Sequence, residues 1–206
     1  MFASLPLASA AFAFFVIAVS PGPATISNAT IAMNYGRSAS LRYSSGLSLG
    51  LIFWGMIAAS GMGVVLQGSL YVLMILKILG GLYLFWLAFS SARSARRKEA
   101  EDIRVLKDHR WFLRGLLLNM SNPKSVIAWM AALSIGINLH DDIYTLVITV
   151  AVCILVGFVT NAMYSVVFSI QGMMTWYRSF RRRIEAVTSG IFALAGFGLI
   201  RSAFTR

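Results

Sequence analysis

A lysine, two asparagines and a proline stand together within an apolar part of the chain, in the stretch Asn119-Met-Ser-Asn122-Pro123-Lys124. In hydrocarbon, a proline frees a backbone carbonyl and a lysine costs about 2.5–3.5 kcal/mol on an insertion scale, so such residues are tolerated mainly where they line a cavity or pathway. A second interruption, Ser20-Pro21-Gly22-Pro23, lies near the N-terminus. The chemistry that these two stretches offer is the binding of an anionic group.

Each interruption can begin a new half-helix, because proline at the first helical position loses no hydrogen bond and has a helical φ. Gly22 and Asn122 would then be N-caps, and first-turn N–H groups such as those of Ile26 and Ser125 would lack intrahelical partners. Such a terminus can bind a carboxylate, and Lys124 adds a positive charge. The candidate substrate-binding residues here are Pro21, Gly22, Pro23, Thr25, Asn119, Asn122, Pro123 and Lys124.

A simpler interpretation is that these are two ordinary proline kinks, with Lys124 extending to the aqueous face. Lys77, a second lysine in an apolar stretch, either extends outward in the same way or contributes to the pathway, and we include it among the candidates. Asn161 and Thr160 are more typical of residues that hold helices together.

The composition places these residues in a membrane protein. The 206 residues are 58% hydrophobic and 12% charged, with a mean hydropathy of +0.76, whereas soluble domains are roughly 45–50% apolar and 25% charged. The net charge of +11 does not indicate nucleic acid, because the basic residues cluster in short gaps between apolar stretches. The expected macromolecular environment is a lipid bilayer, and no nucleic-acid partner is expected.

Six apolar segments, each near the ~20 residues needed to span a bilayer, are predicted at 5–34, 43–66, 70–90, 113–137, 143–170 and 185–204. They form one domain over 1–206, with repeat one at about 1–90, a cytoplasmic linker at about 91–112 and repeat two at about 113–206. An odd number of crossings inverts the second repeat in the bilayer. The predicted fold is all-α, with six transmembrane helices in a 3+3 inverted repeat and a broken first helix in each half.

The charges predict the orientation. Fourteen of the 18 Lys and Arg residues lie in or beside the first, third and fifth gaps, whereas the gaps at 67–69 and 138–142 hold none. By the positive-inside rule, both termini should be extracytoplasmic in a multi-pass protein of the bacterial inner membrane, with Arg201 and Arg206 opposing this assignment.

The predicted segments offer little other chemistry. Their only carboxylate, Glu185, stands at the edge of the last segment, where Arg181 and Arg182 are its expected ion-pair partners. No carrier for proton coupling is therefore evident, since proton relays usually employ intramembrane carboxylates or histidines. No metal-ligand cluster, paired nucleophile and base, or phosphate-binding loop supports an enzyme, a metal site or a cofactor.

Four motifs occur in order: Ser20-Pro21-Gly22-Pro23; Gly46-Leu-Ser-Leu-Gly50 followed by Trp54; Leu76-Lys77-Ile-Leu-Gly80-Gly81-Leu-Tyr83-Leu-Phe-Trp86-Leu87; and Gly115-Leu-Leu-Leu-Asn119 with Asn122-Pro123-Lys124. Together they resemble the lysine exporter (LysE/RhtB) family of bacterial amino-acid exporters, over most of the chain. The resemblance implies an inner-membrane exporter of amino acids or similar small metabolites, driven by the proton-motive force. It also supports a role for Lys77, because the family carries a lysine there.

Two residues depart from the family pattern. Ala24 stands where members commonly have Asn, and Leu51 stands where many have Asp or another polar residue. Both changes remove polarity from the presumed pathway and fit a less polar or atypical substrate.

The sequence thus predicts a secondary transporter that exports a zwitterionic small molecule, most readily a neutral amino acid. The alternatives are a non-transporting membrane scaffold with a degenerate substrate site, and a passive channel, for which six short spans would have to oligomerise. A homo-oligomer is compatible with the sequence.

Overall fold

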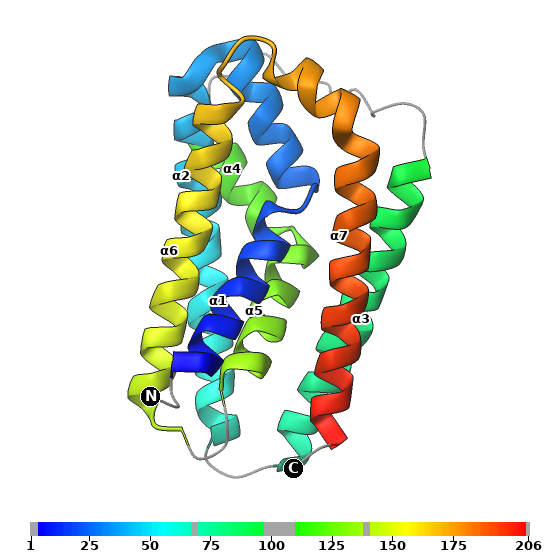
Figure 1. Ribbon diagram of the computed structural model, residues 1–206. Helices are drawn as coiled ribbons and strands as arrows, with labels where there is room; N and C mark the ends of the chain where they lie inside the picture. Colours follow the sequence, from blue (N-terminus) through cyan, green and yellow to red (C-terminus); the bar gives the residue numbers. More distant parts are fainter. Residues whose placement is uncertain (1–3, 67–69, 97–109, 138–140, 205–206) are drawn as a thin grey trace.

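The computed structural model describes residues 4–66, 70–96, 110–137 and 141–204, and these residues form helices and no strand (Figure 1). The helices are α1 (Ser4–Val19), α2 (Pro23–Leu66), α3 (Leu70–Arg96), α4 (Trp111–Met120), α5 (Pro123–Gly136), α6 (Ile143–Val167) and α7 (Met173–Phe204). The predicted all-α architecture is confirmed at this level. Most of the predicted linker lies outside the described residues.

Both predicted helix breaks are present. The first separates the end of α1 from Pro23, and the second separates the end of α4 from Pro123. In each case the proline is the first residue of the following helix, where its missing N–H removes no intrahelical bond. The two half-helix pairs therefore bring four helix ends into the interior of the bundle (Figure 1).

Two predicted boundaries were wrong. The first two segments are not separated by a gap at 35–42, because Gly36 alone, with φ 82°, reverses the chain and helix continues on both sides of it within α2. The last helix begins at Met173 rather than at 185, directly after Gly172 with φ 86°. The basic stretch before residue 185 predicts a gap between apolar segments, but it is helical, since arginine is a good helix former.

Close packing of α2 against α4 depends on glycine. A Cβ added at Gly46 would collide with the carbonyl oxygen of Phe112, and one added at Gly115 would collide with the carbonyl oxygen of Tyr43. The spaced glycines of this part of α2 thus act as a helix-packing surface. Elsewhere α6 packs against α1 and α2, α1 packs against α5, and α3 packs mainly against α7.

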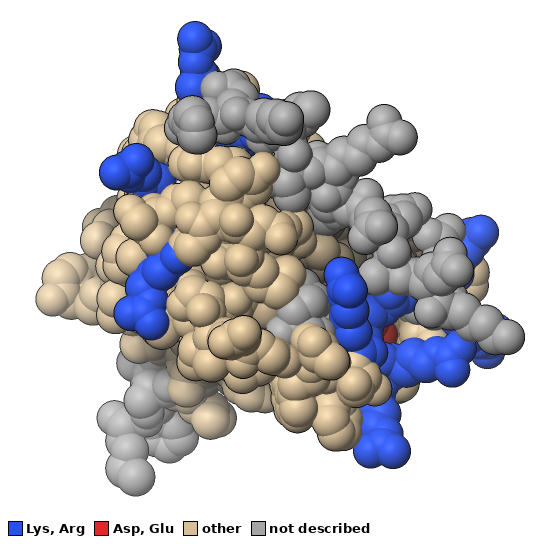
Figure 2. Space-filling view, turned by 90° about the horizontal axis from the view of Figure 1, so that it is seen from above, with Lys and Arg blue, Asp and Glu red and all other residues tan. Residues whose placement is uncertain are grey.

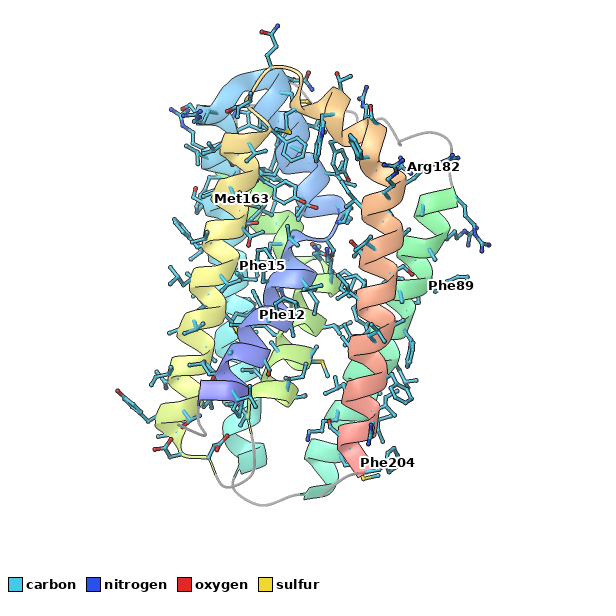
Figure 3. The ribbon with its side chains drawn as sticks, viewed as in Figure 1. Phe12, Phe15, Phe89, Met163, Arg182 and Phe204 are labelled. Carbon is cyan, nitrogen blue, oxygen red and sulfur yellow. The ribbon has the colours of Figure 1, made fainter. Side chains whose placement is uncertain are left out.

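The helices are apolar on their buried and on their exposed faces. Inside, the rings of Phe14 and Trp129 lie 4.8 Å apart within a large apolar cluster. Outside, Phe12, Phe89 and Phe204 are exposed at different heights of the bundle (Figure 3). Among the described residues, three helical stretches are long and apolar enough to cross a membrane, namely Pro23–Gly61, Ile143–Val167 and Thr175–Phe204. Hydrocarbon is the environment in which such a surface is stable.

Charge is concentrated at one end of the bundle. The first turn of α1 and the last turn of α7 lie at one end, whereas the Gly36 turn and Arg182 lie at the other (Figures 1 and 3). Seen from above, this second end carries many Lys and Arg side chains (Figure 2). We call it the basic end; the helix ends there carry Arg37, Arg42, Arg93, Arg96, Arg110, Arg178, Arg181, Arg182 and Arg183.

Candidate functional site

A cavity of about 50 Å³ lies where the two helix breaks meet. One water molecule needs roughly 10–15 Å³ by this measure, so the space accommodates several. We call it the central cavity. Its polar lining consists of Thr25, Asn119, Asn122, Lys124, Ser125 and Asn161, and its apolar lining includes Phe14, Ile17, Leu51 and Ala128.

Lys124 connects the two breaks. Its Nζ atom donates a hydrogen bond of 2.7 Å to the backbone carbonyl of Ser20, just beyond the end of α1. Gly22 leaves room for this ammonium, because a Cβ added there would lie 3.2 Å from Nζ. The lysine side chain thus reaches across to the first break, where the negative end of the α1 dipole favours a cation.

The second break begins with a side-chain cap. Asn122 has extended backbone angles, and its Oδ1 atom accepts a hydrogen bond of 3.1 Å from the N–H of Lys124. This confirms Asn122 as the N-cap of α5 and explains why an asparagine precedes Pro123.

The prediction that Ile26 and Ser125 have free N–H groups was wrong. The N–H of Ile26 donates to the Gly22 carbonyl at 2.9 Å, and that of Ser125 donates to the Asn122 carbonyl at 3.0 Å. Both half-helices form their first hydrogen bond at the cap residue itself. The ammonium of Lys124 is therefore the strongest donor that this site offers to an anion.

The first break is held by side chains from the same turn and from α6. Thr25 Oγ1 accepts from the N–H of Gly22 at 3.0 Å and donates back to the Gly22 carbonyl at 3.1 Å. The hydroxyl of Tyr164 donates to the Val19 carbonyl at 2.7 Å. Lys124 and Tyr164 thus satisfy neighbouring carbonyls at the end of α1.

Asn119 is the last polar residue of α4 and is 4% exposed. Its Oδ1 atom is buried and has no donor among the described residues. The side chain packs on α2, where a Cβ at Gly50 would lie 2.8 Å from the Cβ of Asn119. A buried acceptor without a hydrogen bond destabilises a protein by about 1–3 kcal/mol. A bound molecule that donates a hydrogen bond to Asn119 would remove this penalty.

The structure brings some of the candidate residues together and leaves others apart. Five of them line the central cavity: Gly22, Thr25, Asn119, Asn122 and Lys124. Pro21, Pro23 and Pro123 shape the breaks without lining the cavity. Lys77 lies elsewhere, between α3 and α7, with its Nζ atom 3.4 Å from the Ser202 carbonyl.

Asn161 of α6, which the sequence favours as a residue that holds helices together, lines the central cavity. The sequence around a single asparagine in an apolar segment does not indicate whether the side chain faces another helix or a cavity. Both departures from the family pattern, Ala24 and Leu51, also lie on the cavity wall.

Glu185 is predicted at the edge of the last apolar segment; in the structure it lies well inside α7, which begins at Met173. Its side chain is 5% exposed, and its Oε1 atom lies 3.6 Å from Nε of Arg181, which confirms that ion pair. Within the described ranges, Glu185 is the buried carboxylate.

No group of three His, Cys, Asp or Glu side chains in the described part of the chain could hold a metal ion. The arrangement instead offers one cation, several neutral hydrogen-bonding groups and an apolar wall. Residues 15–203, which include both breaks and all of the cavity lining except Phe14, match the family model of the LysE type translocator.

The chain belongs to the LysE-type translocator family. Its relatives include the threonine efflux protein of Escherichia coli K12, which is 27% identical over 203 residues that cover 92% of this chain and 93% of the relative. The homoserine/homoserine lactone efflux protein of Salmonella typhimurium is 30% identical over 119 residues, 57% of each chain. No solved structure matches this LysE-type chain.

Proposed function

We propose that this LysE-type translocator exports a neutral amino acid across the bacterial inner membrane and binds it in the central cavity. The observation that carries the proposal is the position of the Lys124 ammonium, inside the bundle at the junction of two helix breaks. The efflux of amino acids named for its relatives supports the substrate class.

The cavity lining suits a small zwitterion. The substrate carboxylate would pair with Lys124, which has donors to spare because its ammonium carries three N–H groups. The substrate ammonium would donate to Asn119, whose Oδ1 atom lacks a donor within the described residues. Leu51 and Ala24 on the wall favour a small, weakly polar side chain over a second charge.

Transport would proceed by alternating access. In this proposal the chain forms a 3+3 inverted repeat, and half-helices from the two repeats move relative to each other around the cavity. The basic end would face the cytoplasm, with both termini on the opposite side.

The proton-motive force would drive export, and Glu185 is the carboxylate that we assign to coupling. It is buried, and its Oε1 atom lies 3.6 Å from Nε of Arg181. A proton on Glu185 would weaken its attraction for Arg181, and in this proposal the change passes to the cavity through α1 and α5, which α7 contacts.

The test is export by cells that express wild type or Lys124→Ala, fed with a panel of dipeptides to load the cytoplasm, with each amino acid followed outside. We expect accelerated appearance of small neutral amino acids from wild-type cells and none above background from the variant. Export against a gradient would exclude a channel. Absence of export for every amino acid, with wild-type protein in the membrane, would overturn the proposal and favour the scaffold.

A further inference from the structure

Two rows of polar side chains face each other between α2 and α6. Ser40, Ser44 and Ser48 follow each other at intervals of four residues on α2; Asn161 and Ser165 do so on α6, and Ser169 follows at the same interval in the turn just after α6 ends. Residues four apart lie on one face of a helix, so each row forms a stripe. Together with Asn28 we call these residues the polar ladder.

Direct hydrogen bonds join the two stripes. The hydroxyls of Ser44 and Ser165 lie 2.6 Å apart, and Ser40 donates to Ser165 at 2.8 Å. One turn along, Nδ2 of Asn161 donates to Ser48 at 3.2 Å. Ser40 and Ser165 have no exposed surface, so these contacts are formed away from water.

Asn28 ties the other arm of α2 into the same contacts. Its Nδ2 atom donates to Ser44 Oγ and to the Asn161 carbonyl, both at 2.9 Å, and its Oδ1 atom accepts from Ser40 at 2.6 Å. The side chain is completely buried. The ladder thus joins three helical segments by hydrogen bonds: the part of α2 before Gly36, the part of α2 after it, and α6.

The ladder leads from the cavity to the basic end. Asn161 lines the central cavity at one end of the α6 stripe. At the other end, Nε of Arg37, next to the Gly36 turn, donates to Ser169 Oγ at 3.3 Å. Other parts of the cavity wall have different chemistry, because Phe14, Ile17, Leu51 and Ala128 belong to the apolar cluster.

We infer that the polar ladder is the route by which substrate passes between the basic end and the central cavity, and that the route is closed in this structure. This inference rests on the proposed export function. Interhelical hydrogen bonds in membranes average about 0.6 kcal/mol each, so α2 and α6 separate at modest cost. The freed hydroxyls then bind water or a zwitterion, which an apolar interface cannot do.

A fixed helix-packing role is the alternative, and a reversible cross-link separates the two. Ser44→Cys with Ser165→Cys, in a Cys153→Ala background, places two sulfur atoms where the hydroxyls lie 2.6 Å apart. Added copper-phenanthroline oxidises the pair to a disulfide, which is measured by loss of maleimide labelling. We expect the reduced variant to export amino acid, the oxidised one to lose at least nine-tenths of that export, and dithiothreitol to restore it.

The single variants Ser44→Cys and Ser165→Cys, treated in the same way, should export equally before and after oxidation. Unchanged export by the cross-linked protein would overturn the route, and failure of the disulfide to form would overturn the closed ladder itself. Absence of export from wild-type cells would instead refute the proposed function. If the pair does not reach the membrane, Ser40→Cys with Ser165→Cys, from hydroxyls 2.8 Å apart, gives the same readout.

Discussion

The ammonium of Lys124, on the second residue of α5, donates a 2.7 Å hydrogen bond to the carbonyl of Ser20, just past the end of α1. This bond joins the two helix breaks of the bundle directly. Any movement of one broken helix against the other must break it or carry both breaks together. A substrate carboxylate that binds Lys124 competes with the same bond, which couples occupancy of the cavity to the relative position of the breaks.

Replacing Lys124 by methionine should lower export roughly 10- to 150-fold, because a hydrogen bond to a charged group contributes about 1.5–3 kcal/mol. The measurement is the initial rate of amino-acid efflux from dipeptide-loaded cells, normalised to the protein in the membrane. Lys77→Met removes the same charge between α3 and α7, away from the cavity, and should retain most export. Equal losses in the two variants would contradict a specific role for the cavity lysine.

Asn122→Ala should destabilise the start of α5, because N-cap replacement by alanine typically costs about 0.5–2 kcal/mol. The expected result is a lower thermal unfolding temperature in detergent. Asn122→Asp retains an acceptor for the N–H of Lys124 and should unfold close to wild type. Identical unfolding of the alanine and aspartate variants would show that the cap contributes nothing.

Gly46→Ala should separate α2 from α4, since its methyl group would collide with the Phe112 carbonyl. Overpacking of this kind costs about 1–3 kcal/mol. Gly61 lies on the same helix with open space around it, so Gly61→Ala should be neutral or slightly stabilising. The thermal unfolding temperatures of both variants in detergent test this prediction. Equal unfolding temperatures for Gly46→Ala and Gly61→Ala would contradict it.

Glu185→Gln should uncouple export from the proton gradient, because glutamine has the same size as glutamate but cannot bind or release a proton. In wild-type cells a protonophore should stop concentrative export; in the variant the remaining flux should respond little to it. Glu185→Asp keeps the charge near Arg181 and serves as the matched control. Full protonophore sensitivity and a normal rate in Glu185→Gln would exclude this residue from coupling.

The sequence was sufficient to predict the helix breaks, because proline and polar residues in an apolar stretch have few stable arrangements. It also identified Asn122 as a cap and placed Lys124 at the second break. The partner of Lys124 could not be predicted, since the Ser20 acceptor is a backbone carbonyl and carries no side-chain signature.

Hydropathy misplaced the start of α7 for a related reason. Its first turns are basic, which predicts a gap, but the rings of Trp176 and Phe180 contact each other along the helix, tilted by 35° with centroids 5.0 Å apart. Lys77 and Lys124 looked alike in sequence, yet packing of α3 on α7 holds one away from the cavity that the other lines. Such differences arise only from tertiary contacts.

During synthesis, the first helix break is made before the residues that donate hydrogen bonds to its carbonyls. The carbonyls of Val19 and Ser20 receive their donors from Tyr164 and Lys124, which follow 145 and 104 residues later in the chain. Until those residues leave the ribosome, the Val19 carbonyl lacks its donor from Tyr164, and the Ser20 carbonyl has the longer, 3.4 Å bond from Thr25 in place of the Lys124 ammonium. An unsatisfied carbonyl costs several kcal/mol in hydrocarbon. The segment around the first break, from the end of α1 to the start of α2, is therefore expected to stay beside water or the insertion machinery until the second half of the chain has been made.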